Sequence, residues 1–144
     1  MIQKAEAKDI NILVKLASLL WNNHTINELI EEFSKIMSSP KAQFFIKYEN
    51  DIPVGFAQCQ LRYDYVEGSE TSPVGYLEGI FVKSEYRNKG YAKELLAECE
   101  LWAKDNGCRE FASDCEINNK NSFQFHKAMN FIEVNRIICF IKKL

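Results

Sequence analysis

The sequence predicts an α+β protein in which helices flank a central sheet that is mixed but mostly antiparallel. Three observations lead to this prediction. Apolar residues recur at helical spacing in the N-terminal part, strand-like runs joined by short turns follow, and helices then alternate with strands. Hairpins produce antiparallel strand pairs, and the later crossovers produce a parallel pair. The length of 144 residues suits a single domain over residues 1–144.

The N-terminal part is predicted to hold two amphipathic helices. The first covers residues 9–21, where apolar side chains recur every three or four positions. Thr25 followed by Glu28 forms a capping box that opens the second helix, and residues 38–40, with a proline, end it. A short strand over residues 1–5 is expected to precede both helices.

Three strands are predicted in the middle of the chain. Residues 42–48 are rich in aromatic side chains and are predicted to form a strand, residues 53–62 form the next strand, and the polar residues 49–51 between them form a hairpin turn. A polar loop over residues 63–73 leads to the third strand, residues 74–82. This order predicts neighbouring antiparallel strands.

The C-terminal part is predicted to alternate helices and strands. Residues 91–106 have an apolar helical face and end at Gly107, a typical C-terminal cap. A short strand over residues 109–114, a helix over 120–129 and a last strand over 132–142 follow.

The composition excludes several function classes. The formal net charge is -2, which disfavours a nucleic-acid-binding protein. No apolar run approaches the roughly 18 residues of a membrane span, and the N-terminus has no apolar signal segment. The five cysteines are odd in number and none is spaced C-x-x-C, so neither a metal site nor a redox motif is predicted. Reduced thiols indicate a cytoplasmic protein.

The segment that carries chemistry is Arg-x-x-Gly-x-Ala, from Arg87 to Ala92, between a predicted strand and a predicted helix. The first turn of a helix offers unpaired backbone N–H groups to an anion. Gly90 allows close approach of the backbone, and Arg87 and Lys89 add positive charge. These features favour a pyrophosphate site. The alternative is a tight turn with a solvated arginine.

With this motif and this order of elements, the chain resembles the GCN5-related N-acetyltransferase (GNAT) superfamily over essentially its whole length. The resemblance implies the GNAT fold, with acetyl-CoA as co-substrate and no metal. It implies that the pyrophosphate is bound by Arg87, Asn88, Lys89, Gly90, Tyr91 and Ala92. It further implies that Ile80, Phe81 and Val82 bind the pantetheine arm and the acetyl carbonyl, and that Asn119 contacts CoA.

The segment from Asn119 to Phe131 is similar to a second motif of the family, and two of its departures from that pattern matter. His126 stands where the family has a tyrosine that acts as general acid toward the CoA thiolate, so His126 is a candidate for that role. The alternative is a histidine packed among apolar neighbours. Asn130 stands where glycine is usual, and asparagine also adopts left-handed conformations.

A closer resemblance, to the short aminoglycoside 6'-N-acetyltransferases, rests on residues 65–80, on Trp21 and on residues 111–114. It implies that the substrate is a small polycationic aminoglycoside, acetylated on its 6'-amine with resistance as the consequence. The substrate-site residues that it implies are Trp21, Tyr65, Glu78 and Asp114. A further acidic contact of these enzymes falls on Asn135 here.

The residues themselves also favour a cationic acceptor. Glu78 interrupts an otherwise apolar strand, where a carboxylate is costly unless it is paired or faces a cleft. Asp114 ends the neighbouring predicted strand, and two carboxylates at a sheet opening attract an amine. The alternatives are that Glu78 pairs with a structural arginine, that Trp21 is a core residue and that Tyr65 is a surface ring.

The predicted mechanism is direct attack in a ternary complex. Glu78 positions the amine and takes its proton, and a backbone N–H near Phe81 or Val82 stabilises the oxyanion. No cysteine has an evident histidine partner, which disfavours an acyl-enzyme. The alternatives are a polyamine or a protein amine as acceptor, or a non-catalytic acyl-CoA-binding module. The apolar stretch of residues 136–142 could pair across an interface, which favours a homodimer.

Overall fold

The computed structural model describes all 144 residues and contains one five-stranded sheet. The strands lie in chain order: β1 (Ile2–Lys4), β2 (Ala42–Glu49), β3 (Ile52–Arg62), β4 (Val74–Val82) and β5 (Phe111–Ala112). The first four pair antiparallel, and β5 pairs parallel to β4. The predicted sheet, mixed but mostly antiparallel, is confirmed.

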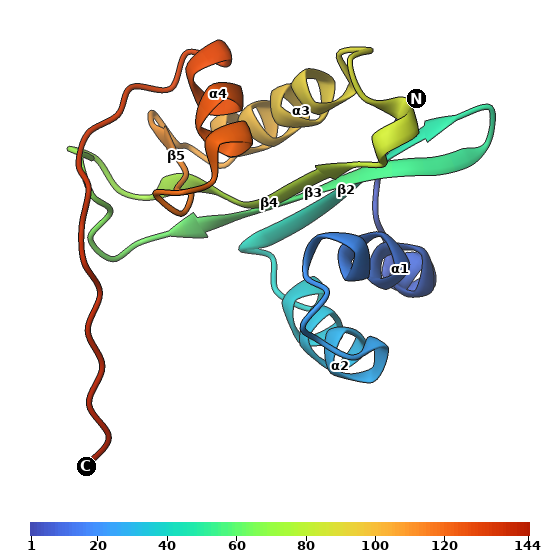
Figure 1. Cartoon of the computed structure of the whole chain (residues 1–144), viewed down its shortest axis with the longest axis horizontal. Helices are drawn as coiled ribbons and strands as arrows, with labels where there is room; N and C mark the ends of the chain where they lie inside the picture. Colours follow the sequence, from blue (N-terminus) through green and yellow to red (C-terminus); the bar gives the residue numbers. More distant parts are fainter.

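Helices cover both faces of this sheet. The helices are α1 (Ile10–Leu20), α2 (Ile26–Met37), α3 (Tyr91–Asp105) and α4 (Lys120–Ala128), with short 3₁₀ turns at Ala7–Asp9 and Ser84–Tyr86. Helices α1 and α2 lie on one face, and α3 and α4 on the other (Figure 1). None of the helices is long and apolar enough to cross a bilayer.

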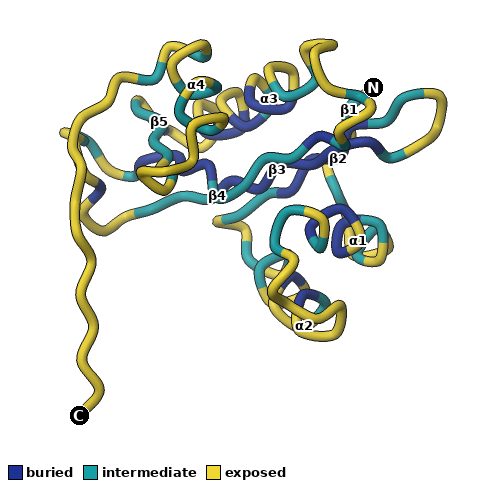
Figure 2. Tube along the Cα trace, viewed as in Figure 1, coloured by how far each residue is buried: buried dark blue, intermediate teal, exposed yellow.

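The α1–α2 face is held by an aromatic cluster. Helix α2 begins at the predicted N-cap, where the Thr25 hydroxyl accepts a hydrogen bond from the Glu28 N–H at 3.1 Å. The Glu28 side chain lies 3.4 Å from His24 Nδ1, so the reciprocal half of the predicted capping box does not form. Its inner residue Phe33 packs on Phe44 of β2, with ring centroids 4.7 Å apart, and meets Trp21 edge-on at 6.2 Å. Both phenylalanines are fully buried, and α1, α2 and the central strands each contain stretches coloured as buried in Figure 2. This packing fixes the position of Trp21 at the end of α1.

The other face is covered mainly by α3. Its inner residues, including Leu95, Cys99 and Trp102, are buried against β3 and β4. The helix ends as predicted at Gly107, which has a φ of +86° that a side chain would oppose. The β2–β3 hairpin likewise turns through Asn50 and Asp51, which both have positive φ.

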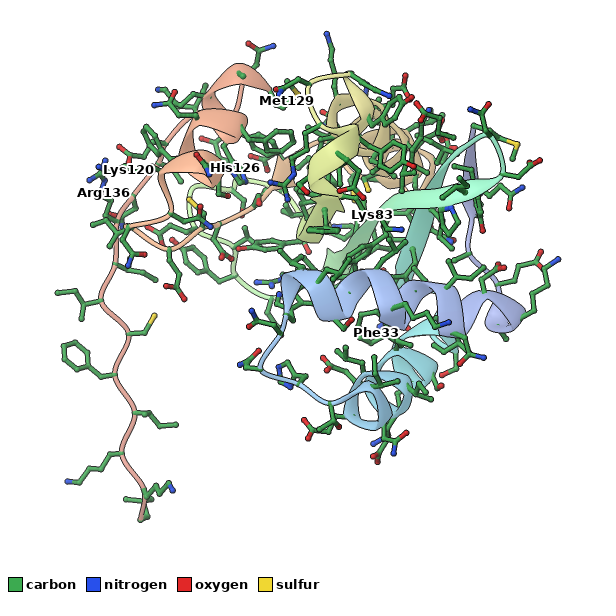
Figure 3. All side chains as sticks on the ribbon, turned by 45° about the vertical axis from the view of Figure 1, so that its right-hand side comes forward. Phe33, Lys83, Lys120, His126, Met129 and Arg136 are labelled. Carbon is green, nitrogen blue, oxygen red and sulfur yellow. The ribbon has the colours of Figure 1, made fainter.

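The last predicted strand, residues 132–142, is wrong for this chain taken alone. Phe131 still packs against Phe111. Residues 132–144 form an extended tail without regular secondary structure, which leads away from the sheet (Figure 1). Its apolar side chains point into solvent (Figure 3), and Phe140 and Ile141 are 89% and 95% exposed. A strand exists only where another strand takes up its backbone hydrogen bonds, and the tail meets none. Strand β5 is also shorter than the predicted residues 109–114.

Candidate active site

A β-bulge in β4 positions the central carboxylate. Gln58 pairs with Gly79 and Cys59 with Leu77, so Glu78 is the extra residue between them. A bulge turns two successive side-chain positions to the same face of the sheet. Glu78 and Gly79 accordingly both face the α1–α2 side, whereas Leu77 packs against the α3 side. Glu78 therefore faces the cavity between the sheet and the helices α1 and α2.

Glu78 opens into a cavity of about 210 Å³ between β3, β4 and the helices α1 and α2. The cavity is lined by Trp21, His24, Leu29, Glu32, Gln58 and Glu78. The structure thus brings together Trp21 and Glu78, which sequence analysis singled out separately. Sequence analysis missed Glu32, because a glutamate on an amphipathic helix resembles any solvated residue. Glu32 forms no ion pair and adds a second carboxylate to the cavity.

The predicted carboxylates both have partners. Arg62, at the end of β3, donates from Nε and Nη2 to Glu78 Oε1, at 3.1 and 2.8 Å. Its guanidinium lies over the Tyr76 ring, 3.4 Å from the centroid, and the Tyr76 hydroxyl donates to Asp114. Glu78 therefore does pair with an arginine, as one interpretation of this residue predicts. Glu78 is nonetheless 20% exposed and faces the cavity.

The pKa of Glu78 is raised above its ordinary value. Burial is the largest cause because it disfavours the charged carboxylate. The hydrogen bonds and the charge of Arg62 lower this pKa in part, and the negative charge of Asp114 raises it. A carboxyl with a raised pKa is a better proton acceptor than an ordinary glutamate.

Tyr65 and Asn135 meet at a residue that sequence analysis did not single out, Glu67. The Tyr65 hydroxyl donates to Glu67 Oε2 at 3.0 Å, and Asn135 Nδ2 donates to Glu67 Oε1 at 2.6 Å. The Tyr65 side chain is 79% exposed. Val66, which lies between Tyr65 and Glu67 in the sequence, packs on Tyr76. Glu67 supplies negative charge next to Asn135, where a carboxylate was expected. The only sequence signal for it was its place in an acidic loop.

The predicted anion cradle has the required geometry at the start of α3. Asn88 and Gly90 have φ of +63° and +83°, and a side chain at Gly90 would meet no atom within 4 Å. Arg87 is oriented by its Nε, which donates to the Val82 carbonyl at 2.8 Å. Lys89 lies 3.1 Å from Glu49, so its charge is already paired. The first-turn N–H groups and Arg87 are the groups best placed for an anion.

Next to the cradle, β4 has a free edge. Strand β5 pairs with β4 only at Gly75 and Tyr76, and from Leu77 onward β4 has no strand on that side. The free edge includes Ile80, Phe81 and Val82. Unpaired backbone groups of an edge strand can bind an extended ligand by adding it to the sheet. This edge is where the resemblance places the pantetheine arm, and Glu78 lies in the same stretch of β4.

Helix α4 holds Asn119 and His126, the latter labelled in Figure 3. The Asn119 side chain accepts the N–H of Ser122 at 3.1 Å and so caps the helix. His126 Nδ1 lies 2.6 Å from the Ser122 carbonyl, which only a protonated Nδ1 can satisfy, and Nε2 lies 2.8 Å from Ser113 Oγ. In the neutral ring, Nε2 therefore accepts the Ser113 proton. The chain forms no cluster of three or more residues able to hold a metal ion.

The chain is similar to known acetyltransferases in both sequence and structure. The profile of the family described as Acetyltransferase (GNAT) family matches residues 11–131. The aminoglycoside N(6')-acetyltransferase type 1 of Acinetobacter baumannii is 38% identical over 129 residues, 90% of this chain and 88% of that protein. The enzyme of the same name from Serratia marcescens is 37% identical over 145 residues, covering 100% and 99%. The solved structure of AAC(6')-Iy in complex with the bisubstrate analog CoA-S-monomethyl-acetylneamine superposes with a TM-score of 0.96 at 33% identity, covering 100% of this chain and 98% of the other.

Proposed function

Because this chain belongs to the acetyltransferase (GNAT) family, we propose that it transfers the acetyl group of acetyl-CoA to the 6'-amino group of aminoglycosides. The observation that carries the proposal is the placement of Glu78. It lies on a bulge at the point where the free edge of β4 meets an acidic cavity. The similar enzymes named above carry this activity in their names, and one was solved with a bisubstrate analog.

The acceptor side suits a polycationic sugar. Glu78 Oε2 accepts no hydrogen bond from the protein and is free to bind an ammonium group. Glu32 and Asp114 supply further negative charge for other amines. Trp21 offers a flat apolar wall for a sugar ring, supported from behind by Phe33 and Phe56. Tyr65 and Asn135 both donate to Glu67, and Val66 packs on Tyr76, so we assign Tyr65, Glu67 and Asn135 to the outer edge of the acceptor site.

In the proposed mechanism the amine attacks the thioester directly. Glu78 orients the ammonium group and takes its proton, directly or through water, and the amine nitrogen bonds to the acetyl carbon. A backbone N–H of Phe81 or Val82 stabilises the oxyanion, and the C–S bond then breaks to release CoA as its thiolate, for which His126 is the candidate proton donor. A cysteine acyl-enzyme has little support. A hydrogen bond with Cys59, followed by burial, raises the pKa of Cys99, and burial raises that of Cys108. Such thiols are poor nucleophiles.

One assay separates the candidate functions. Thiol release from acetyl-CoA is measured with kanamycin, with spermidine and without an acceptor, and the kanamycin product is located by NMR. Kanamycin-dependent release with acetylation at the 6'-amine supports the proposal. Faster release with spermidine would favour a polyamine acetyltransferase, and no acceptor-dependent release would leave only a binding module. Expression in a sensitive bacterium should raise the kanamycin concentration that inhibits growth.

Gly79→Ala is expected to damage the acceptor site selectively. A Cβ at Gly79 would lie 2.6 Å from the Trp21 ring, which must then shift. Overpacking of this kind costs roughly 1–3 kcal/mol of folding stability. Because the displaced Trp21 ring would no longer orient the acceptor, we expect kcat/KM for kanamycin to fall about tenfold or more. The KM for acetyl-CoA should not change. Gly107→Ala is the matched control, because it imposes backbone strain far from Trp21. An equal loss in both variants would contradict the role of Trp21.

His126→Ala tests the proposed general acid. If His126 protonates the CoA thiolate, kcat should fall by about tenfold or more with little change in either KM. If its contacts with Ser113 and Ser122 only support packing, stability should fall while kcat is retained. Steady-state kinetics and thermal unfolding on the same protein distinguish the two results.

A homodimer is also proposed, on the evidence of the tail. Residues 136–142 present exposed apolar side chains and unpaired backbone, and a second copy could pair with them. Light scattering should then give twice the chain mass, and truncation after Asn135 should give a monomer. We propose a cytoplasmic location, because all five cysteines are free thiols.

A further inference from the structure

Arg62 contacts Glu78 in an asymmetric way. Both of its donated hydrogen bonds end on the same oxygen, Oε1, and Oε2 receives none. The guanidinium is 37% exposed and is kept in place by the Tyr76 ring beneath it. Gln58 lines the cavity and Arg62 lies four positions further along β3, so both point to the same face. The arginine is thus part of the site and not of the surface around it.

We propose that Arg62 is a positioning residue for the acetyl transfer: it fixes Glu78 Oε1 so that Oε2 faces the acceptor amine, and it holds the carboxylate ionised. This inference rests on the proposed function of Glu78. The two bonds from one rigid guanidinium leave the carboxylate little freedom to rotate. The free oxygen is therefore presented in one direction only.

The same arginine links the two carboxylates of the site. Tyr76 carries Arg62 on its ring and donates its hydroxyl to Asp114, so the four side chains form one connected unit. A shift of Arg62 would move the Glu78 carboxylate through its hydrogen bonds and the Asp114 carboxylate through Tyr76. The positive charge of Arg62 thereby offsets part of the negative charge of Glu78 and Asp114, and the remaining negative charge can bind ammonium groups.

The charges around Glu78 predict the direction of a pH effect. Arg62 on β3 is the cation that faces it. Asp114 beyond β5 and Glu32 on α2 are negative, and His24 before α2 lines the same cavity. Removing Arg62 leaves burial and negative charge, which both disfavour the ionised carboxylate. The pKa of Glu78 must then rise, and activity that needs the carboxylate must be lost at a higher pH than in the wild type.

The test is the pH profile of kcat/KM for kanamycin in Arg62→Gln and Arg62→Lys. In the wild type, kcat/KM should fall toward low pH as Glu78 takes up a proton, and this fall is called the acidic limb of the profile. We expect the acidic limb to lie about one pH unit higher in Arg62→Gln. We also expect kcat to fall about tenfold, with the KM for acetyl-CoA unchanged. Arg62→Lys should restore the limb, because it keeps the charge, but not the full kcat, because one ammonium group cannot fix Oε1 as two N–H donors do.

Two further variants separate this role from a structural one. Tyr76→Phe keeps the ring under Arg62 and frees Asp114, so it should raise the KM for kanamycin without moving the acidic limb. Lys35→Gln removes an exposed ion pair with Glu31 and should change neither the KM for kanamycin nor the acidic limb. An acidic limb that stays in place in Arg62→Gln would overturn the proposal.

A second measurement does not depend on the acceptor. The Glu78 carboxyl is titrated by NMR in ¹³C-labelled protein, assigned by comparison with Glu78→Gln, in wild type and Arg62→Gln. A raised pKa supports the inference even if kanamycin proves not to be the substrate. An unchanged pKa contradicts it even if the wild-type enzyme acetylates kanamycin.

Discussion

Replacing Glu78 by Gln is expected to lower kcat/KM for kanamycin by about 100-fold or more. The amide has nearly the same size, so the bulge and the cavity should survive, but it can neither accept a proton nor attract an ammonium group. Part of the loss should appear in kcat and part in the KM for kanamycin. The KM for acetyl-CoA should stay the same, because the predicted CoA contacts lie on the free edge of β4 and in the α3 cradle.

Kinetics over a range of both substrates measures these effects, with thermal unfolding to check the fold. Glu31→Gln is the matched control, because Glu31 lies on α2 next to the cavity residue Glu32 but pairs with Lys35 in solvent. A Glu78→Gln enzyme with wild-type kcat and KM for kanamycin would remove Glu78 from both proposed roles.

Arg87→Gln is expected to raise the KM for acetyl-CoA by about 10- to 100-fold. Hydrogen bonds to charged groups contribute about 1.5–3 kcal/mol, and each 1.4 kcal/mol corresponds to about a factor of ten. Lys89 should not replace Arg87, because its charge is paired with Glu49. The KM for kanamycin should not change, since Arg87 is not among the residues that line the cavity beside Glu78.

The effect of Arg87→Gln is measured by varying acetyl-CoA at saturating kanamycin, and by binding of CoA to the free enzyme. Lys104→Gln removes a positive charge in the last turn of the same helix and serves as the control. If both variants bind CoA equally well, the cradle at the start of α3 is not the pyrophosphate site.

Much of the fold was predictable because its signals are local. The bounds of β4 matched the prediction, and α1, α2, α3 and α4 were placed within one or two residues. Each of these elements carries its own periodicity and its own end signal, such as the Thr25 cap or Gly107. The failure at residues 132–142 has the opposite cause. Alternating apolar residues make a strand possible, but only a neighbouring strand makes it form.

The candidate site likewise has parts that local sequence predicts and parts that depend on tertiary contacts. The sequence alone located the candidate anion-binding turn, because Arg87, Gly90 and the first turn of α3 are neighbours along the chain and their geometry is local. It also identified Glu78, a carboxylate in an apolar strand. Only the tertiary structure decided what surrounds Glu78: Arg62 lies 16 residues earlier and Glu32 on another element. Spacing along a chain does not define distance in space, so partners brought together by strand pairing and helix packing cannot be read from it.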